Sequence, residues 1–430
     1  MAVINAFVQN AVDLAEPLTL DAAHALTWRA ALTDSDIGTV GLEIEAHLVD
    51  LESVPDAVAW HRVRRIPDIV SSVSRSRVTL EPGGQVELSG APEQDVVAAI
   101  DTIRHDWQGT RLALAEHGLG VAFVGADPLR PARRVNPRPR YRAMEQHFAA
   151  TGRGTPGAVM MNSSAALQVN LQAGPQRGWP ARVELAHRLG PTLVAIAGCS
   201  PWLNGHPTGW KSVRQATWAQ LDRRSCGLVP GCVTPTADGV GSTDPALAWA
   251  QYAMGAPVII VAGAGDRIEA VRTPVTFGQW AAGLVPLDGR RPTAADLEIH
   301  LSTLFPPVRL RGYLELRFMD ITAPRWWPAI AAVAATLMDD PVAADMAMNA
   351  TERSALLWTR AAQAGLDDQL LADSARRCLS IAASRVPANM RSAVDDLAEL
   401  VESGSCPGDQ LAERITEVGP LAALEELAHA

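Results

Sequence analysis

The sequence predicts an α+β fold with a mainly antiparallel sheet. Several short segments alternate apolar and polar residues, as half-buried strands do. Helical segments separate these strands, and beyond Pro328 the pattern is almost wholly helical. No internal repeat, low-complexity linker or convincing domain boundary interrupts the 430 residues. We therefore expect a single domain over residues 1–430, with its main motifs in 38–330 and a helical C-terminal part in 328–430.

Each predicted element follows from a local pattern. A helix over 12–32 leads into an acidic strand at 38–49, and 56–72 is basic and irregular. Residues 75–90 form a hairpin-like stretch, because Pro82-Gly83-Gly84 marks a turn or bulge. The later predicted elements are a helix (93–117), a buried strand (119–126), a helix (140–150), a strand (162–172), a long helix (179–197), a buried strand (256–263), two helices (277–283 and 293–303) and a last acidic strand (312–320).

The most informative pattern is a set of acidic strands that lie far apart in the sequence. Their charged residues are Glu43 and Glu45, Glu81 and Glu87, and Glu315 with Arg317. Within each strand these residues are separated by an even number of positions, so they share one face of the sheet. Carboxylates on one face repel one another and are costly to bury. A divalent cation is the usual remedy, and oxygen ligands suit Mg²⁺, Mn²⁺ or Ca²⁺ rather than zinc.

A simpler interpretation exists for each acidic strand. A single Glu-x-Glu pair is most often the solvated face of an exposed sheet. Three such strands, one with Arg317 beside Glu315, favour a functional site instead. Gln168 and Asn170 share a face of the strand at 162–172, and a glutamine oxygen facing the carboxylates could act as a weak, uncharged metal ligand.

Arginines gather in two further places. Six of them fall between Arg130 and Arg142, in a loop that four prolines stiffen. Guanidinium groups match phosphate and carboxylate oxygens, although a solvated loop would have the same composition. Arg214 lies between Trp210 and Trp218 at helical spacing. It is either an anion-binding group or an arginine packed on aromatic rings.

Composition excludes several functional classes. The net charge of −10 argues against a nucleic-acid surface spread over the whole protein. The N-terminus is a poor signal peptide and the longest apolar run is too short to span a bilayer, so we expect a cytoplasmic protein with no membrane partner. P-loop and dinucleotide-binding fingerprints are absent. The five cysteines contain no Cys-x-x-Cys, and we expect them to be structural, although Cys226 and Cys232 could pair across a loop.

Six stretches, in order, resemble the glutamate–cysteine ligase family of plant and actinobacterial type. They are GLEIEAHLV (41–49), LEPGGQVELSGAP (80–92), RYRAMEQHF with MMNSSAALQVNLQ (140–148 and 160–172), AGCSPWLNG (197–205), SVRQATWAQLD (212–222) and YLELRFMD (313–320). Within the family, the sequence is most similar to the actinobacterial ligases that open ergothioneine biosynthesis. It departs from the family pattern at Ser163-Ser164, at Gly198-Cys199 and near Ser225, where Arg223 or Arg224 would have to replace a family arginine.

The resemblance implies an ATP-dependent ligase that joins L-glutamate to L-cysteine through γ-glutamyl phosphate. It implies the glutamine synthetase/guanidino kinase fold, a curved and mainly antiparallel sheet that forms a funnel with helices outside. Two or more Mg²⁺ ions are expected, together with the substrates glutamate, cysteine and ATP. Metal ligands would be Glu43, Glu45, Glu87 and Glu315, then Gln168 and Glu81. Catalytic arginines would be Arg317 and Arg214, and substrate-binding residues would be Arg140, Arg214, Trp202, Trp218 and Asn170.

Three alternatives stay open from the sequence. Another carboxylate–amine ligase would use the same residues with a different amine. A non-catalytic Ca²⁺-binding module would use the same carboxylates, but Arg317 inside the acidic face speaks against it because a pure cation site needs no second cation. A phosphagen-type kinase is the third. We expect no nucleic-acid partner, and a monomer is plausible.

Overall fold

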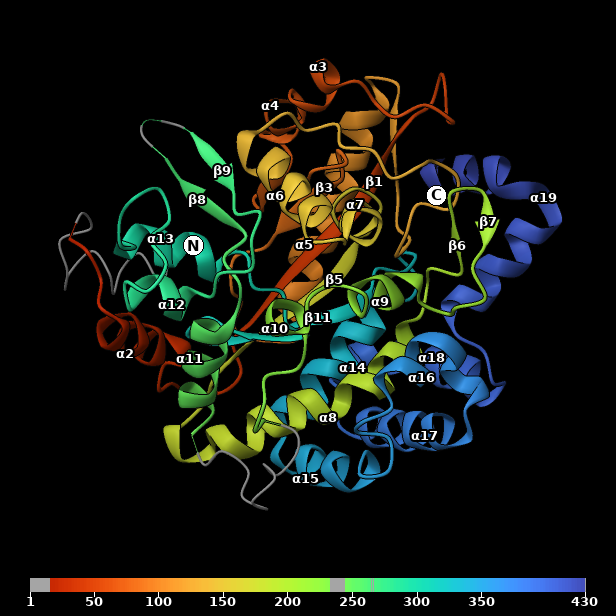
Figure 1. Cartoon of the computed structure of the whole chain (residues 1–430). Coiled ribbons are helices and arrows are strands. Elements are labelled where there is room, and N and C mark those ends of the chain that lie inside the picture. The colour runs from red at the N-terminus through yellow and green to blue at the C-terminus, as the bar shows by residue number, and fades with distance from the viewer. Residues whose placement is uncertain (1–15, 233–243, 264, 266, 430) are drawn as a thin grey trace.

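The computed structural model describes residues 16–429, apart from 233–243, 264 and 266. Its centre is a seven-stranded sheet in which all paired strands run antiparallel (Figure 1). The strand order is β10 (Val308–Leu310), β11 (Tyr313–Asp320), β5 (Ala166–Gln172), β1 (Val40–Asp50), β3 (Val86–Ser89) and β2 (Arg77–Leu80), and β4 (Leu119–Ala122) pairs with the far end of β1. The predicted α+β class with a mainly antiparallel sheet is confirmed.

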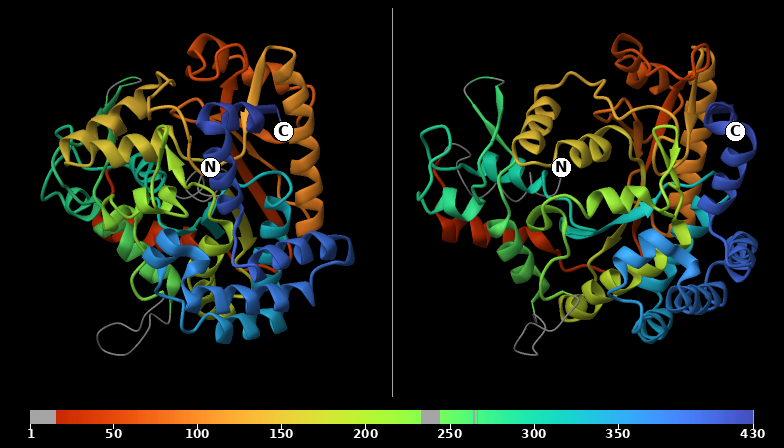
Figure 2. Two further views of the ribbon diagram at one scale, coloured as in Figure 1. Left: turned by 90° about the vertical axis from the view of Figure 1, so that its right-hand side faces the viewer. Right: turned by 45° about the vertical axis from the view of Figure 1, so that its right-hand side comes forward.

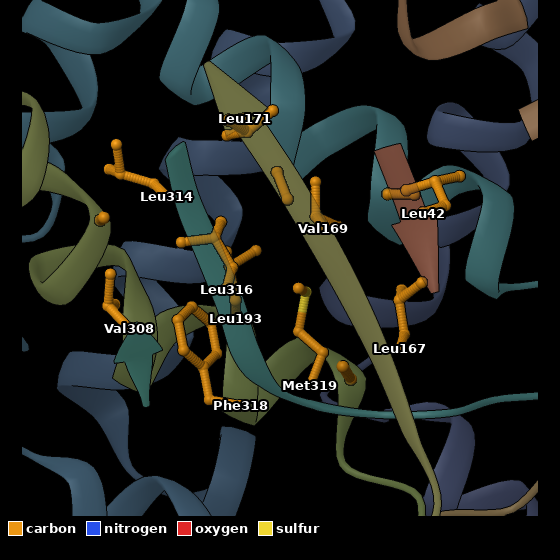
Figure 3. Close-up of a cluster of buried hydrophobic side chains, with 14 of the residues drawn as sticks. Leu42, Leu167, Val169, Leu171, Leu193, Val308, Leu314, Leu316, Phe318 and Met319 are labelled. Carbon is orange, nitrogen blue, oxygen red and sulfur yellow. The ribbon is translucent and has the colours of Figure 1, made fainter. Parts of the chain in front are cut away.

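One face of this sheet is apolar because the strands alternate. Leu42, Val169 and Leu316 point away from the acidic residues and pack together with Leu193 of the helix α8 (Trp179–Ala197) (Figure 3). The helices α5 (Val96–Ala115) and α14 (Trp327–Asp339) complete this layer against β1 and β5. Burial of this continuous apolar surface is the main force that fixes the sheet.

The opposite, polar face is covered by a second group of shorter elements. In Figure 2 these elements and the C-terminal helices lie on opposite sides of the strands. The cover includes α2 (Leu20–Ala31), α6 (Pro139–Ala150), α7 (Gly154–Asn162), α9 (Val213–Trp218), α10 (Arg223–Cys226), α11 (Pro245–Gly255), α12 (Phe277–Ala281) and α13 (Ala294–Leu301), with the ribbon β8 (Ile260–Ala262) and β9 (Ile268–Ala270). A cavity is left between this cover and the sheet.

The chain after β11 is helical, as predicted. The helices are α14, α15 (Pro341–Ala350), α16 (Trp358–Ala364), α17 (Gln369–Ala383), α18 (Arg391–Glu402) and α19 (Pro407–His429). The last of them is interrupted at Gly419, whose φ of 82° only glycine adopts readily, just before Pro420. None of the helices in the described residues is both long and apolar enough to cross a membrane.

Several predicted elements are confirmed and two predictions are wrong. The helix at 179–197, the hairpin at 75–90 and the helix at 93–117 are all present. Residues 56–72 are not irregular, because buried Val63, Ile66 and Val70 anchor two short helices, α3 (Trp60–Val63) and α4 (Ile66–Val70). The strand predicted at 256–263 forms only over Ile260–Ala262 and pairs with β9 instead of joining the main sheet.

The remaining differences lie at the ends of elements. Helix α2 spans Leu20–Ala31, and residues 12–15 of its predicted range fall outside the described residues. Thr276 and Thr293 begin α12 and α13 with capping boxes, which fix both starts. Other short elements are the hairpin β6 (Trp202–Leu203) and β7 (His206–Pro207) and the 3₁₀ turns Gln176–Gly178, Gly365–Asp367 and Ala388–Met390.

Candidate active site

The antiparallel register brings the predicted acidic residues together on the polar face. Glu45 of β1 lies directly opposite Glu87 of β3. Glu43 lies opposite Gln168 of β5, and Glu315 of β11 lies opposite Asn170 on the other side of β5. Residues from four strands therefore share one surface, although they come from positions 43 to 315 of the sequence.

Uncharged hydrogen-bond donors hold three of these carboxylates in place. Glu45 accepts hydrogen bonds from the Ala166 amide at 2.8 Å and from Gln168 Nε2 at 3.2 Å. Glu43 accepts from Asn170 Nδ2 at 3.0 Å. Glu87 accepts from Thr79 and Ser89, at 2.6 and 3.1 Å. These contacts orient Glu43, Glu45 and Glu87 without neutralising their charge.

Gln168 and Asn170 are thus placed as organisers of the acidic face. The Oε1 of Gln168 accepts a hydrogen bond from Arg317 at 2.6 Å, while its Nε2 donates to Glu45. Gln168 therefore bridges the acidic residues of β1 and the arginine of β11. A metal role for Gln168 and a substrate contact for Asn170 both stay predictions.

The carboxylates border a cavity of about 640 Å³, whose lining also includes Arg140, Arg214 and Arg317. Burial, followed by repulsion from Glu87 and Glu315, raises the pKa of Glu43 to about 7. Burial is also the largest cause of the raised pKa values of Glu45, Glu81 and Glu87. A surface that penalises ionisation of four carboxylates fits a divalent cation, which would offset their repulsion.

Those side chains do not yet form a closed metal site. Among the residues that the structure describes, no group of three or more His, Cys, Asp or Glu side chains converges closely enough to hold an ion. This is the arrangement expected for Mg²⁺, which is commonly held by one or two carboxylates and completed by substrate phosphates and water. Magnesium ligation by Glu43, Glu45, Glu81 and Glu87 stays a prediction that their chemistry fits.

Glu315 differs from the other carboxylates because three arginines surround it. Arg309 donates Nε and Nη2 to its two oxygens at 2.5 and 3.0 Å. Arg317 lies 3.2 Å away and Arg311 3.4 Å away. Although Glu315 is fully buried, these guanidinium groups hold its pKa below the usual range, Arg309 most strongly. Both of its oxygens accept hydrogen bonds from Arg309, which would compete with a metal ion for them. A metal role for Glu315 stays a prediction.

Arg214 is a buried arginine with donors to spare. Its backbone amide donates to Ser200 Oγ at 3.2 Å and its Nη2 donates to the Arg317 carbonyl at 2.7 Å. Its Nε and Nη1 find no hydrogen-bond partner among the described residues. Arg214 borders the acidic cavity, and a guanidinium group suits the oxygens of a carboxylate or phosphate.

Of the other predicted substrate residues, Arg140 and Trp218 border the acidic cavity and Trp202 does not. Arg140 borders the acidic cavity and donates to the carbonyl and hydroxyl oxygens of Ser302 at 3.1 and 3.0 Å. Trp218 also borders this cavity and contacts the ring of Phe305. Trp202 lies in the β6–β7 hairpin and is not part of the lining of this cavity. The structure therefore gives no support for a substrate role of Trp202.

A second cavity of about 780 Å³ adjoins the first and was missed by the sequence reasoning. Trp218, Phe305 and Arg317 border both cavities. The rest of its wall includes Trp210, Phe318, Tyr252 and Trp358. These aromatic residues come from α9, β11, α11 and α16 and the adjoining loops, so no local sequence pattern could reveal the cavity.

Arg309 and Asp320 were also not singled out, although both flank predicted site residues. The alternation of Arg309 in β10 and Arg311 just after it, opposite an acidic strand, is the signal that could have found the arginine cluster. Near Ser225, Arg224 already pairs with Asp222 at 2.8 Å. Both Arg223 and Arg224 border the second cavity, and Arg223 is the better candidate for the displaced family arginine.

Comparisons with known proteins agree with this geometry. The sequence model described as "Glutamate-cysteine ligase family 2 (GCS2)" matches residues 39–427. The chain is 47% identical to the glutamate–cysteine ligase EgtA of Mycobacterium tuberculosis over 93% of this chain and 91% of that protein. It is 46% identical to EgtA of Mycolicibacterium smegmatis, over 93% and 92%, respectively. The chloroplastic enzyme of Brassica juncea is 29% identical over 63% of this chain and 51% of its own.

A solved structure supports the fold. The glutamate–cysteine ligase of Francisella tularensis, determined in complex with AMP, aligns with a TM-score of 0.55 over 92% of this chain and 88% of that one. Its sequence identity is 14%, so the likeness concerns the fold alone. It agrees with the predicted fold class.

Proposed function

This chain belongs to glutamate–cysteine ligase family 2, and we propose that it joins the γ-carboxylate of L-glutamate to the amine of L-cysteine through γ-glutamyl phosphate. The reaction consumes ATP and gives γ-glutamylcysteine, ADP and phosphate. The observation that carries the proposal is the polar sheet face, where Glu43, Glu45 and Glu87 meet Arg317 beside a cavity of about 640 Å³. That face supplies carboxylates that would hold a cation and an arginine that would stabilise negative charge during phosphoryl transfer between two anions.

The chemistry explains why the site contains no nucleophile of its own. A carboxylate does not react with an amine at neutral pH, because oxide is a very poor leaving group. Phosphorylation of the glutamate γ-carboxylate turns that oxygen into part of a good leaving group. The amine then attacks the acyl carbon and phosphate departs. The protein has to position the two anions and stabilise the charge that develops between them.

The arginines have distinct proposed roles. Arg317 is held on the acidic face by Gln168 and Glu315, where it would stabilise the transferring phosphoryl group or the tetrahedral intermediate. Arg214 borders the cavity, has two donors without hydrogen-bond partners among the described residues, and would bind a substrate carboxylate of glutamate. Arg140 borders the same cavity and would bind phosphate or glutamate.

Magnesium is the proposed ion, with Glu43, Glu45, Glu81 and Glu87 as the residues that would hold it. When bound, Mg²⁺ would neutralise phosphate charge as the two anions approach. Glu45 and Glu87 lie opposite each other, and the chain itself keeps both oriented through Ala166, Gln168, Thr79 and Ser89. The protein would therefore orient the carboxylates that hold the ion, and the ion would supply positive charge.

The likeness to the mycobacterial EgtA enzymes supports a place in ergothioneine biosynthesis and, with it, a cytoplasmic location. The size of the aromatic second cavity makes the identity of the amine worth testing directly. ADP release should be measured with glutamate alone and then with cysteine or a panel of other amino acids. The proposal predicts that cysteine stimulates ADP release above every other amine. Stronger stimulation by a different amine would identify another carboxylate–amine ligase.

A further inference from the structure

We infer that Asp320 positions Arg214 for binding of the substrate carboxylate, by fixing the first turn of α9 from the end of β11. Asp320 would not touch the substrate. The inference rests on the proposed role of Arg214 and adds a residue that the acidic face does not include.

Asp320 is buried, and its carboxylate connects three segments of the chain through hydrogen bonds. It is 2% exposed, and its Oδ2 accepts hydrogen bonds from the Cys199 amide at 3.0 Å and from Ser200 Oγ at 2.6 Å. Its Oδ1 accepts from Ser212 Oγ at 3.0 Å. The carboxylate therefore joins the end of β11 to the loop after α8 and to the start of α9. A side chain at Gly125 would stand only 2.5 Å from its Cγ, so the backbone closes tightly over this group.

Ser200 and Ser212 connect Asp320 to the first turn of α9, where Arg214 lies. Ser212 is the N-cap of α9, and its Oγ also accepts the amide of Gln215 at 3.2 Å. Ser200 Oγ accepts the backbone amide of Arg214 itself at 3.2 Å. Arg214 therefore lies in a first helical turn that is tied to one carboxylate through two serine hydroxyl groups.

The charge of Asp320 acts on the same guanidinium. Its Oδ1 lies 3.6 Å from Arg214 Nη1, an ion pair without a hydrogen bond. Burial raises the pKa of Asp320, whereas Arg214 and the two serines act in the opposite direction and favour the carboxylate form. The ion pair keeps a buried cation tolerable before substrate arrives, and because it takes up no hydrogen-bond donor, it leaves Nε and Nη1 unpaired.

Replacing the charge while keeping the size of the side chain isolates this role. In Asp320→Asn the carboxylate charge is lost, and a partner of Oδ1 or Oδ2 would face an amide nitrogen in place of an oxygen. A displacement of about 1 Å at a positioned group can cost on the order of a hundredfold. We expect the KM for glutamate to rise by about tenfold to a hundredfold, with a smaller change in the KM for ATP. A residue that was merely structural would affect stability and leave this difference between the two KM values unchanged.

The test compares Asp320→Asn with Asp339→Asn in the full-length protein. Asp339 is half-buried and also pairs with an arginine, Arg182, at 2.5 Å, but it lies at the end of α14, outside the lining of both cavities. Both variants should lose thermal stability, and only Asp320→Asn should raise the KM for glutamate selectively. Equal KM values for the two variants would overturn the inference.

Two further measurements keep the result interpretable. If Asp320→Asn does not fold, Ser212→Ala removes the link between Asp320 and α9 together with the N-cap hydrogen bond to Gln215, and should show the same selective rise in smaller measure. An unchanged KM for glutamate would then count against the inference. Arg214→Lys tests the premise separately, because an unchanged KM for glutamate there would overturn the proposed role of Arg214. In the double variant the two effects should not add, and full additivity would show that Asp320 acts independently of Arg214.

Discussion

Glu45 and Glu87 lie directly opposite each other on adjacent antiparallel strands, with both side chains half-buried on the same face. Like charges at such positions destabilise a sheet. Hydrogen bonds from Gln168 and Thr79 orient the pair without removing its charge. A cation that arrives with the substrates would offset this cost in stability.

Replacing Glu43 or Glu45 by glutamine should greatly reduce turnover while leaving the fold intact. Removing one of several repelling carboxylates should also keep the melting temperature unchanged or raise it. Thermal unfolding and ADP release at saturating Mg²⁺ measure the two effects. Glu417→Gln, which alters an exposed ion pair on α19, is the matched control and should affect neither. Full activity of both active-site variants would remove these residues from the metal site.

Arg317→Lys should lower turnover by about two orders of magnitude, the effect of losing one transition-state donor. Lysine keeps the charge but loses the planar guanidinium group, whose Nη1 contacts both Gln168 and Glu315 and whose other donors remain for a substrate. Steady-state kinetics, with circular dichroism as a check of folding, would measure this. Unchanged turnover combined with impaired folding would show that Arg317 is only a structural partner of Glu315.

Between about pH 4.5 and about pH 7, the protein without Mg²⁺ should lose stability relative to the Glu43→Gln variant. The pKa of Glu43 is raised from 4.5 to about 7, so in this interval its carboxyl group binds more protons in the folded state than in the unfolded state. Buried His47, His187 and His300, whose pKa values are lowered to about 4, act in the opposite direction in both proteins, so only the difference between the two isolates Glu43. Urea unfolding across this interval should show the free energy of unfolding of the unchanged protein falling relative to that of Glu43→Gln. Identical pH profiles would contradict the raised pKa of Glu43.

The cysteines should be dispensable for the chemistry. All five are buried and free, including Cys226 and Cys232, which do not form the pair that the sequence allowed. Burial raises the pKa of Cys226 to about 12, so its thiol is not a reactive nucleophile even though it borders the second cavity. Replacing Cys199, Cys226, Cys232, Cys378 and Cys406 one at a time should leave turnover near that of the unchanged protein. Loss of activity in a folded variant would contradict this.

Much of the site could be predicted because strand parity is a local property. The positions of Glu43 and Glu45 fix which face each occupies, whatever the rest of the chain does. Their neighbours could not be predicted, because pairing of Glu45 with Glu87 depends on the register of strands some forty residues apart. The irregularity between Leu316 and Met319, where the β5–β11 register shifts and Arg317 lies, is likewise a tertiary feature.

Two aromatic residues show the same limit. The family resemblance predicts a substrate contact for Trp202, but the chain turns into the β6–β7 hairpin after Pro201, so Trp202 is not part of the lining of the acidic cavity and its substrate role stays a prediction. Trp358 was overlooked because it reaches the second cavity from a helix in the C-terminal part. In both cases the deciding contacts join residues that are distant in sequence, and neither hydrophobic periodicity nor turn signals contain that information.

The most direct test of the account follows one oxygen atom. Glutamate labelled with ¹⁸O in its γ-carboxylate should be incubated with ATP, cysteine and the protein, and the inorganic phosphate analysed by mass spectrometry. If the γ-carboxylate is phosphorylated, one labelled oxygen leaves with the phosphate as the amide bond forms, and ADP accumulates. Phosphate without the label, or release of pyrophosphate with the label transferred to AMP, would contradict the acyl-phosphate mechanism.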